Sequence, residues 1–461
     1  MQQANVEALL SGHYRCPDDF ARFSVTRDLS LALGYFQFGS GTVCYGQCSS
    51  GVAPILPARN LQDAYQHVST HAETVLLPFD PVQVVNNLRL ERYTDKSASR
   101  SGLRTTRGLV RSLYYSARPF MSVAVRKHLQ SLYLRGWEKI PFPSWPVDRT
   151  VENILEQLLL LAMKSRNLDR LPFIWFWPDG NRSCAMLTHD VETRAGLDFC
   201  PQLMDLNDSF GIKSSFQLVP EERYSFSRRF LDNMRERGFE VNVHDLNHDG
   251  HLFAERAEFL RRAERIKRYA QEYGALGFRS AVLYRNADWC DALDFSYDMS
   301  MPNVAHLDPQ RGGCCTVFPF FIGRTLELPV TTTQDYSLFY ILKDYSIRLW
   351  KQQIALIGAK HGLISFIVHP DYVIESAAQR VYVELLDYLS GLRARREICI
   401  ALPGEIAAWW KLRSEMTLVQ SGGSWTIVGK GSERARVAYA VRVEDKLVYE
   451  METVSAELAV R

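Results

Sequence analysis

Short apolar runs alternate with longer charged stretches between about residues 171 and 410. The apolar runs read FIWFW, CAMLT, SSFQLV, FEVNV, FRSAVL and LISFIV, and residues 222–237 and 254–273 between them are charged with a helical pattern. Apolar runs of this length, separated by amphipathic helices, are typical of strands buried in a parallel sheet. The pattern therefore predicts an α/β fold with a parallel sheet or barrel in this part of the chain.

The regions on either side have different patterns. Residues 20–95 hold short apolar and aromatic runs interrupted by glycines, which favours a small strand-rich unit. Residues 151–168 repeat apolar positions with helical period and predict one amphipathic helix. The C-terminal stretch alternates apolar and polar positions between turn signals, which predicts three or four antiparallel strands. We therefore expect a strand-rich N-terminal region (1–97), a basic helical region with a linker (98–170), an α/β barrel (171–412) and a small C-terminal β module (413–461).

Charge changes this picture in one segment. The whole chain has 54 Lys and Arg against 52 Asp and Glu, a net charge of +2, which does not suggest a nucleic-acid partner. Residues 98–137, however, contain eight basic residues and no acidic one, interleaved with aromatic residues. This composition fits a surface for an anionic partner such as a membrane face, but helices whose basic faces are solvated or paired with acidic patches explain it more simply.

Cysteines and apolar segments bear on location. The nine cysteines match no small disulfide scaffold, so we expect free thiols in a reducing compartment. The N-terminal residues show no basic segment followed by an apolar one, as a secretory signal would. The longest apolar stretch with helical period, near residues 154–163, includes Glu156 and Gln157 and is too short to span a bilayer. The sequence thus predicts a cytoplasmic protein, with peripheral membrane contact through residues 98–137 as an option.

Side chains that can do chemistry gather where the predicted strands end. The carboxyl ends of strands form the active face of an α/β barrel, so these side chains are expected to meet. Two histidines four residues apart on a helical turn can also ligate one metal ion. Each feature alone has an ordinary structural explanation, and it is their succession along the chain that indicates a site. The residues are Asp190 and Glu192, His244 and His248, Arg279, and His369 with Asp371.

These motifs make the window 171–410 resemble the polysaccharide deacetylases of the NodB-homology type, carbohydrate esterase family four. The family has five ordered motifs. Three match well, and they are Thr188-His189-Asp190-Val191-Glu192, the pair His244 and His248, and Ile367-Val368-His369. Two match in part, and they are Phe278-Arg279-Ser280-Ala281 and an Asp-x-Ser segment at Asp294-Phe295-Ser296 or Asp298-Met299-Ser300.

The resemblance implies a distorted (β/α) barrel of seven or eight strands that holds one divalent metal ion, commonly zinc. Carried onto this sequence, it makes Asp190 the general base and Glu192, His244 and His248 the metal ligands. His369 would be the general acid, oriented by Asp371 or Asp298. Arg279 would keep Asp190 ionised and oriented. The metal ion would polarise the amide and lower the pKa of water, and a backbone N–H after the third motif would help to hold the oxyanion.

Two departures from the family pattern stand out. Glu192 replaces the usual Asp, so its carboxylate must retract by one methylene to hold a metal ion at the same depth. Ser280-Ala281 replaces the proline of the third motif, which leaves turnover less assured than metal binding. Tyr284 and Trp289 are candidate substrate-binding residues, the tryptophan by stacking on a sugar ring. Trp409 and Trp410 fit a barrel core better than a sugar site.

The sequence therefore predicts a metal-dependent deacetylase that removes an N- or O-acetyl group from an amino-sugar-containing polysaccharide or its precursor. One alternative is a C–N hydrolase that acts on a non-glycan amide with the same metal chemistry. Another is a catalytically impaired barrel that binds glycans or serves as a scaffold in polysaccharide assembly. The partner in either glycan hypothesis is an acetylated glycan or its precursor, and no nucleic acid is expected.

Overall fold

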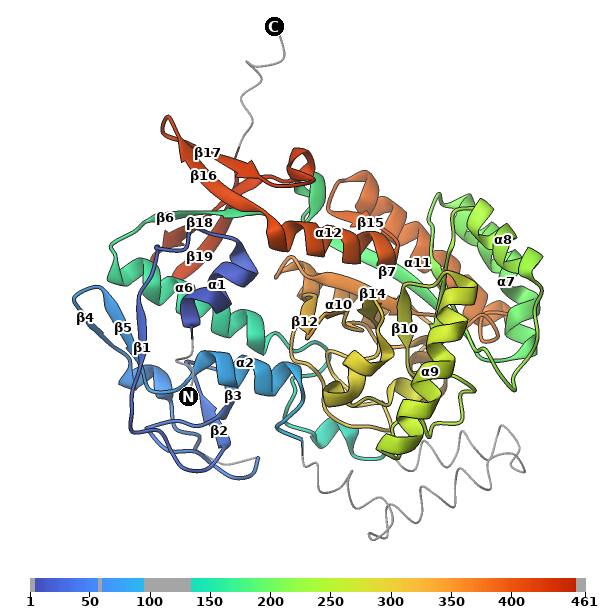
Figure 1. The fold of residues 1–461 in the computed structure, drawn as a ribbon, viewed down its shortest axis with the longest axis horizontal. Coiled ribbons are helices and arrows are strands. Elements are labelled where there is room, and N and C mark those ends of the chain that lie inside the picture. The colour runs from blue at the N-terminus through green and yellow to red at the C-terminus, as the bar shows by residue number, and fades with distance from the viewer. Residues whose placement is uncertain (1–4, 57–59, 95–133, 453–461) are drawn as a thin grey trace, which may run out of the picture. The chain divides into compact units, whose positions relative to one another are not determined.

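The structure is a computed structural model that describes residues 5–56, 60–94 and 134–452. The chain forms two compact units (Figure 1). Unit 1 comprises Met1–Leu88, Thr150–Asn181 and Ala408–Arg461, and unit 2 comprises Arg89–Arg149 and Arg182–Ala407. Both units combine segments that are distant in the sequence. The four domain limits expected from the sequence remain a prediction.

Unit 2 contains the predicted alternation of strands and helices. Its elements are β7 (Ser183–Val191), α7 (Arg194–Ser209), β8 (Ser215–Leu218), α8 (Arg228–Glu236), β9 (Glu240–His244), α9 (Arg256–Tyr273), β10 (Gly277–Arg279), β11 (Tyr297–Asp298), β12 (Phe320–Ile322), β13 (Thr325–Glu327), α10 (Arg348–Gly358), β14 (Leu363–Ile367), α11 (Ser376–Ala394) and β15 (Ile398–Ile400). Helix α12 (Pro403–Glu415) follows and continues into unit 1.

The strands of unit 2 form one curled, half-barrel sheet. The order is β12-β13-β11-β10-β9-β8-β7-β14, and β15 also pairs with β7. Every pairing is parallel except that of β12 with β13. This confirms the mixed α/β class and a barrel-like parallel sheet. Because neighbouring parallel strands end at the same edge, the motifs that follow β7, β9, β10 and β14 are brought together.

The burial of these strands explains why their sequences are apolar runs. All nine residues of β7 are buried, as are all residues of β8 and β14. A parallel strand that is buried on both faces has no solvent side, so it shows no polar alternation. Helix α7 begins where the Thr193 hydroxyl accepts a hydrogen bond from the Gly196 amide, which ends the strand segment after Glu192.

Two apolar runs do not behave as the pattern predicts. The run FIWFW contributes only its first two residues to a strand, β6 (Arg170–Ile174), which lies outside the parallel sheet and pairs antiparallel with β18 (Val437–Val443) in unit 1. The run FRSAVL is a strand only at its first two residues, which end β10, because the chain then turns. Val282 and Leu283 have φ of 57° and 53° there, so the backbone is left-handed at two successive side-chain-bearing residues.

Unit 1 is built of small sheets and helices. Its remaining elements are α1 (Val6–Tyr14), β1 (Phe23–Val25), β2 (Gly34–Gln37), β3 (Val43–Gly46), β4 (Ser69–His71), β5 (Thr74–Leu77), α2 (Pro81–Arg89), α6 (Thr150–Ser165), β16 (Thr417–Ser421), β17 (Ser424–Val428) and β19 (Lys446–Met451). Its sheets have the orders β1-β5-β4, β2-β3, β19-β18-β6 and β16-β17. Helix α6 is the amphipathic helix expected at residues 151–168.

Several other expectations concern the whole chain. All nine cysteines are free thiols and eight of them are buried, as predicted. Within the described ranges, no helix combines the length and apolar character needed to cross a bilayer. Residues 98–133, which make up most of the basic segment, lie outside the described residues, so its predicted anionic partner stays a prediction.

Candidate metal centre

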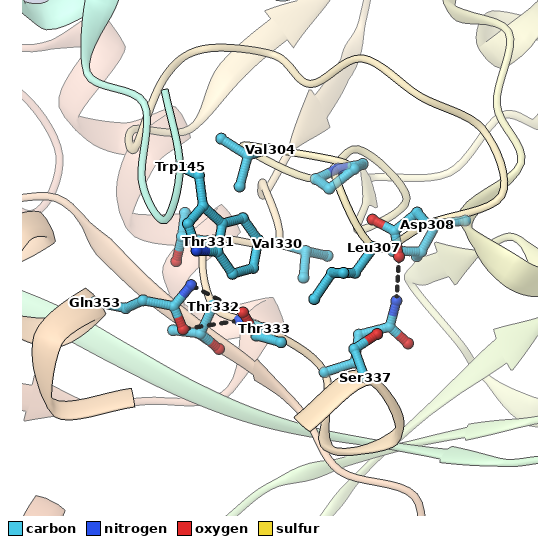
Figure 2. A pocket seen from close by; sticks show the side chains of 13 residues that line it. Trp145, Val304, Leu307, Asp308, Val330, Thr331, Thr332, Thr333, Ser337 and Gln353 are labelled. Atoms are coloured by element: carbon cyan, nitrogen blue, oxygen red, sulfur yellow. Dashed lines mark hydrogen bonds between the residues drawn. The ribbon is translucent and has the colours of Figure 1, made fainter. Parts of the chain in front are cut away.

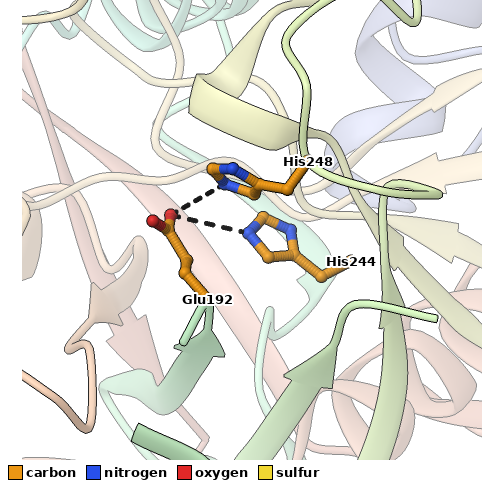
Figure 3. A group of neighbouring side chains, drawn as sticks. All are labelled: Glu192, His244 and His248. Carbon is orange, nitrogen blue, oxygen red and sulfur yellow. Dashed lines mark ion pairs between the residues drawn. The ribbon is translucent and has the colours of Figure 1, made fainter. Parts of the chain in front are cut away.

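Three side chains from two strand ends converge in unit 2 (Figure 3). Glu192 follows directly on β7, His244 is the last residue of β9, and His248 lies in the loop after it. Glu192 Oε1 is 2.8 Å from His248 Nε2 and 3.8 Å from His244 Nε2. One ligand atom from each of the three residues lies within 4.8 Å of the others. The sequence-predicted ligand set is thus assembled in space.

The two histidines meet by a different route from the helical turn expected from their spacing. Strand β9 ends at His244, and the chain then bends, with φ of 56° at Asp245 and 57° at His248. Arg223 Nη2 donates a hydrogen bond of 2.6 Å to the His248 carbonyl oxygen and so holds this bend. The imidazole centroids lie 4.8 Å apart as a result. The helical turn was wrong because a four-residue spacing also suits a strand end followed by a tight loop.

The residues fit a divalent metal ion. Nε2 of both His244 and His248 is buried and faces the Glu192 carboxylate, at 3.8 and 2.8 Å. His244 Nδ1 lies 3.1 Å from the Arg279 carbonyl oxygen, which can only accept, so Nδ1 carries the proton. Nε2 is therefore the nitrogen that His244 presents to Glu192 and to a metal ion, as in a metal-ligating histidine fixed by a backbone carbonyl. Two imidazoles and one carboxylate are the protein ligands of open zinc sites.

Charge in the site also favours a ligating carboxylate. Burial alone would raise the pKa of Glu192, but His248, His244 and His369 around it hold that pKa well below its usual range. A carboxylate must be ionised to bind a metal ion, so this environment prepares Glu192 for that role. Its side chain is 20% exposed, whereas both histidines are 1% exposed, so the site opens on the glutamate side.

Asp190 lies beside these residues, paired with Arg279. The pleat of β7 places Asp190 two residues before Glu192, on the same side of the strand. Arg279 Nη1 donates to Asp190 Oδ1 at 2.8 Å and to Thr188 Oγ1 at 2.7 Å. Asp190 Oδ2 is 3.8 Å from His244 Nε2. Burial alone would raise the pKa of Asp190, but Arg279 and the nearby histidines lower it, so the carboxylate is charged.

His369 lies beside Glu192 and is held by the carboxylate of Asp335, a residue that the sequence analysis did not identify. Its Nδ1 and its backbone N–H both bond to Asp335, each at 2.7 Å, while Nε2 lies 3.4 Å from Glu192 Oε1. Neither expected partner, Asp371 or Asp298, takes this place. Asp298 pairs across β11 and β13 with Glu327 and accepts a hydrogen bond from Ser300. Burial alone would lower the pKa of His369, but Asp335 and Glu192 raise it well above its usual value.

We expect Asp335→Asn to lower kcat by about 10- to 100-fold, within the range for general acid–base groups. An amide offers one acceptor where the carboxylate accepts from two His369 N–H groups, so His369 loses its orientation. Without the negative charge the pKa of His369 falls, and the basic limb of the kcat–pH profile moves to lower pH. Steady-state kinetics across pH measure both effects. An unchanged profile would contradict the role of Asp335.

A fully buried polar network lies behind Asp190. His189 Nδ1 is 2.9 Å from the Val368 carbonyl oxygen and therefore donates to it. His189 Nε2 then accepts from Asn207 Nδ2 at 3.2 Å, and Tyr382 donates to Asn207 Oδ1 at 2.6 Å. Asn207 Nδ2 also bonds to Ser214 Oγ at 2.8 Å. The network ties the strand that carries Asp190 to the residue before His369, so it fixes the two groups relative to each other.

Acid should destabilise the protein through His189. Burial lowers the pKa of His189 to about 4, against 6.5 for a free histidine. Between pH 6.5 and 4 the unfolded chain binds the proton and the folded chain does not, so stability falls as the pH falls, by about 3 kcal/mol at most. His189→Gln keeps a donor and an acceptor but does not titrate. Denaturant unfolding should therefore show a smaller loss of stability for His189→Gln than for the wild type over this pH range, and equal losses would contradict the assignment.

The remaining predicted residues lie in more ordinary surroundings. Tyr284 is buried, and Trp289 packs against Phe259 with ring centroids 5.3 Å apart. The predicted substrate contacts of Tyr284 and Trp289 stay predictions. Trp409 and Trp410 are 6% exposed, and Trp409 Nε1 donates to the Phe176 carbonyl oxygen at 2.9 Å. These two tryptophans are packed in unit 1, so they are core residues, although not of the barrel.

A small cavity lies beside the segment that precedes Asp335 (Figure 2). Thr331, Thr332, Thr333 and Gln334 line one side of it, and Trp145 is a further wall. The Thr332 amide donates to the Ser365 carbonyl oxygen of β14 at 3.3 Å. The threonine segment therefore runs beside β14 and delivers Asp335 to His369 at the end of that strand.

Comparisons with solved structures give matches at low sequence identity. About half of the chain resembles polysaccharide deacetylases of known structure. A protein assigned as a polysaccharide deacetylase from Mycobacterium smegmatis has a TM-score of 0.43 and 17% identity, over 52% of this chain and 93% of that one. Peptidoglycan deacetylase PdaC from Bacillus subtilis has a TM-score of 0.33 and 11% identity, over 50% and 92%. The allantoinase PuuE has a TM-score of 0.40 and 13% identity, over 51% and 92%. No protein-family model matches the sequence, and the comparison with curated proteins gives no match.

Proposed function

We propose that this protein is a metal-dependent hydrolase that removes an acetyl group from an amino-sugar-containing glycan or its precursor. The observation that supports this most directly is the convergence of a metal-ligand set, a charged Asp190 and an Asp335-held His369 at one edge of a parallel sheet. An ionised base, a proton donor and an open metal site are the groups that acyl hydrolysis requires.

The geometry of the chain's own residues supports the following roles. Glu192, His244 and His248 would hold the metal ion. When bound there, the ion would polarise the acetyl carbonyl and lower the pKa of water. Asp190 takes the proton of the attacking water at Oδ2, the oxygen not engaged by Arg279. His369 gives the proton on Nε2 to the leaving amine or alcohol, while Asp335 keeps Nδ1 protonated and the ring in place.

The backbone after Arg279 supports a working site over an impaired barrel. The proline of the family's third motif is absent, but Val282 and Leu283 hold consecutive left-handed conformations just beyond it. A β-branched residue with positive φ stores strain, and such strain concentrates at functional sites. We infer that this turn replaces the proline in fixing the backbone next to the reacting acetyl group.

Elemental analysis of the purified protein joined to an acetate-release screen tests the proposal. We expect about one divalent metal ion per chain, zinc in the first instance, and acetate release from chito-oligosaccharides or a related acetylated glycan. Release from a small non-glycan amide alone would favour a C–N hydrolase. Glycan binding that is insensitive to chelators, without hydrolysis, would favour a scaffold. A protein without bound metal would overturn both enzymatic functions.

Location and membrane contact are a separate proposal. We infer a cytoplasmic protein that binds the inner membrane surface peripherally through basic residues 98–137. Attraction of basic side chains to anionic lipids weakens as salt rises. Binding to vesicles that contain phosphatidylserine should therefore decrease between 50 and 500 mM salt, and salt-independent binding or none would contradict this contact.

A further inference from the structure

Three tyrosines form a cluster beside His369 in unit 2. The ring centroids of Tyr336 and Tyr372 are 5.6 Å apart, those of Tyr340 and Tyr372 are 5.2 Å apart, and those of Tyr336 and Tyr340 are 5.5 Å apart. The His369 ring lies 4.9 Å from that of Tyr372. All three tyrosines are half-buried, so each ring retains an accessible part. We call these residues the tyrosine cluster.

Two segments of the chain carry the three tyrosines of the cluster. Tyr340 belongs to a π-helical turn, Ser337–Ile341, and Tyr336 immediately precedes this turn. Leu338 and Phe339 of the same turn are buried, so the tyrosines occupy its less buried side. Single π-helical turns are rare and occur frequently at functional sites. Tyr372 lies in the loop that follows β14 and therefore reaches the cluster from the same strand end as His369.

The cluster adjoins the metal centre. His369 contacts both sides, since its ring packs on Tyr372 and its Nε2 lies 3.4 Å from Glu192 Oε1. Burial, together with the nearby carboxylates of Glu192 and Asp371, raises the pKa of Tyr372 well above its ordinary value. The rings are therefore within reach of a substrate whose acetyl group is at the metal centre.

A carboxylate oxygen completes the polar side of this surface. Asp371 Oδ1 is buried and has no hydrogen-bond partner among the described residues. Leaving a buried acceptor unpaired costs stability, so a donor from a ligand would satisfy it. Asp371 directly precedes Tyr372 in the same loop, and its carboxylate is close enough to affect the Tyr372 hydroxyl electrostatically. Aromatic faces with a few placed polar groups are the usual lining of small-molecule sites.

We propose that the tyrosine cluster and Asp371 form a subsite for a pyranose ring of the glycan, next to the ring that carries the acetyl group. A pyranose has apolar C–H faces and a rim of hydroxyl donors. The faces fit the tyrosine rings, and a hydroxyl fits Asp371 Oδ1. This inference rests on the proposed function for its choice of ligand, and it assigns specificity for an oligosaccharide over a single acetylated sugar.

The test uses ligands that the protein cannot consume. Calorimetry with the glucosamine tetramer and with xylotetraose, neither of which carries acetyl groups, measures binding to the full-length protein independently of turnover. Tyr340→Leu and Tyr372→Leu should each weaken binding about 5- to 10-fold, the size of one aromatic contact. Tyr340→Phe and Tyr372→Phe keep the ring and should stay within about twofold of the wild type. Asp371→Asn should weaken binding of both oligosaccharides.

A control variant tests whether the effect is specific to the cluster, and a second measurement applies if a variant does not fold. Tyr388→Leu removes a tyrosine on α11 that packs on the Lys351 ammonium 4.9 Å away, and it should not change binding. If a Leu variant fails to fold, NMR spectra of the wild type with xylotetraose provide the answer, because stacking on tyrosine moves sugar C–H signals upfield. Wild-type affinity in both Leu variants, or no binding of either oligosaccharide at millimolar concentration, overturns the subsite. Acetate release with no such binding would leave the proposed function standing and remove only this inference.

Discussion

Replacing Asp190 by Asn is expected to lower the rate constant for acetate release by about 10²–10⁴-fold while the protein keeps its metal ion. Asn has nearly the same shape as Asp, but its amide does not take a proton from water. Asp190 lies outside the Glu192, His244 and His248 set, and its Oδ2 is 3.8 Å from His244 Nε2. Measured on the same sample, acetate release should therefore fall while metal content stays at the wild-type level.

Asp190→Asn should also lower the stability of the protein, and control variants can separate this effect from the loss of activity. Arg279 is fully buried and bonds to Asp190, so Asp190→Asn leaves its charge without a counter-ion, at a cost of about 3–5 kcal/mol in stability. Adding Arg279→Met should recover part of that stability without recovering activity. Thr188→Val removes only a hydroxyl that Arg279 also contacts, and activity should largely survive. Activity above about a tenth of the wild type in Asp190→Asn would exclude Asp190 as the base.

The positions at strand ends could be predicted because local sequence defines them. Asp190, Arg279 and His369 each follow or end a short apolar run, and burial of the strand makes that run visible. Once the sheet is parallel, its topology brings these ends to one edge. The sequence therefore predicts which residues meet without predicting how each loop bends, and the helical turn expected at His244 and His248 was wrong for this reason.

The residues that were missed depend on contacts between distant segments. Asp335 follows three threonines and a glutamine, with no apolar run to mark a strand end, and it meets His369 only because this segment lies along β14. The apolar segment at β6 was predicted to lie in the wrong sheet for the same reason, because its pairing depends on a distant segment. Its burial on all but the first residue looks like that of a central strand, but its partner β18 lies more than 250 residues further along the chain. Pattern alone does not choose between partners.

The largest effect on metal binding is expected at Glu192. Glu192→Gln keeps the size of the side chain and removes its charge, so metal affinity should fall by more than about 100-fold, since even outer partners of a metal site contribute 10- to 100-fold. Loss of the metal ion removes several kcal/mol of transition-state stabilisation, about 10³-fold or more in rate. Titration of the apoprotein with zinc measures the first effect, and acetate release measures the second.

Glu192→Asp provides the graded comparison that tests the geometry of the site. Shortening the side chain by one methylene withdraws its oxygen by about 1.5 Å from histidines that it now approaches to 2.8 and 3.8 Å. Metal affinity should therefore lie between those of the wild type and Glu192→Gln. His251→Gln, three residues past His248 and at the surface, should leave affinity unchanged. If Glu192→Asp binds zinc as tightly as the wild type, the carboxylate does not set the depth of the metal ion, and the departure from the family's aspartate carries no structural consequence.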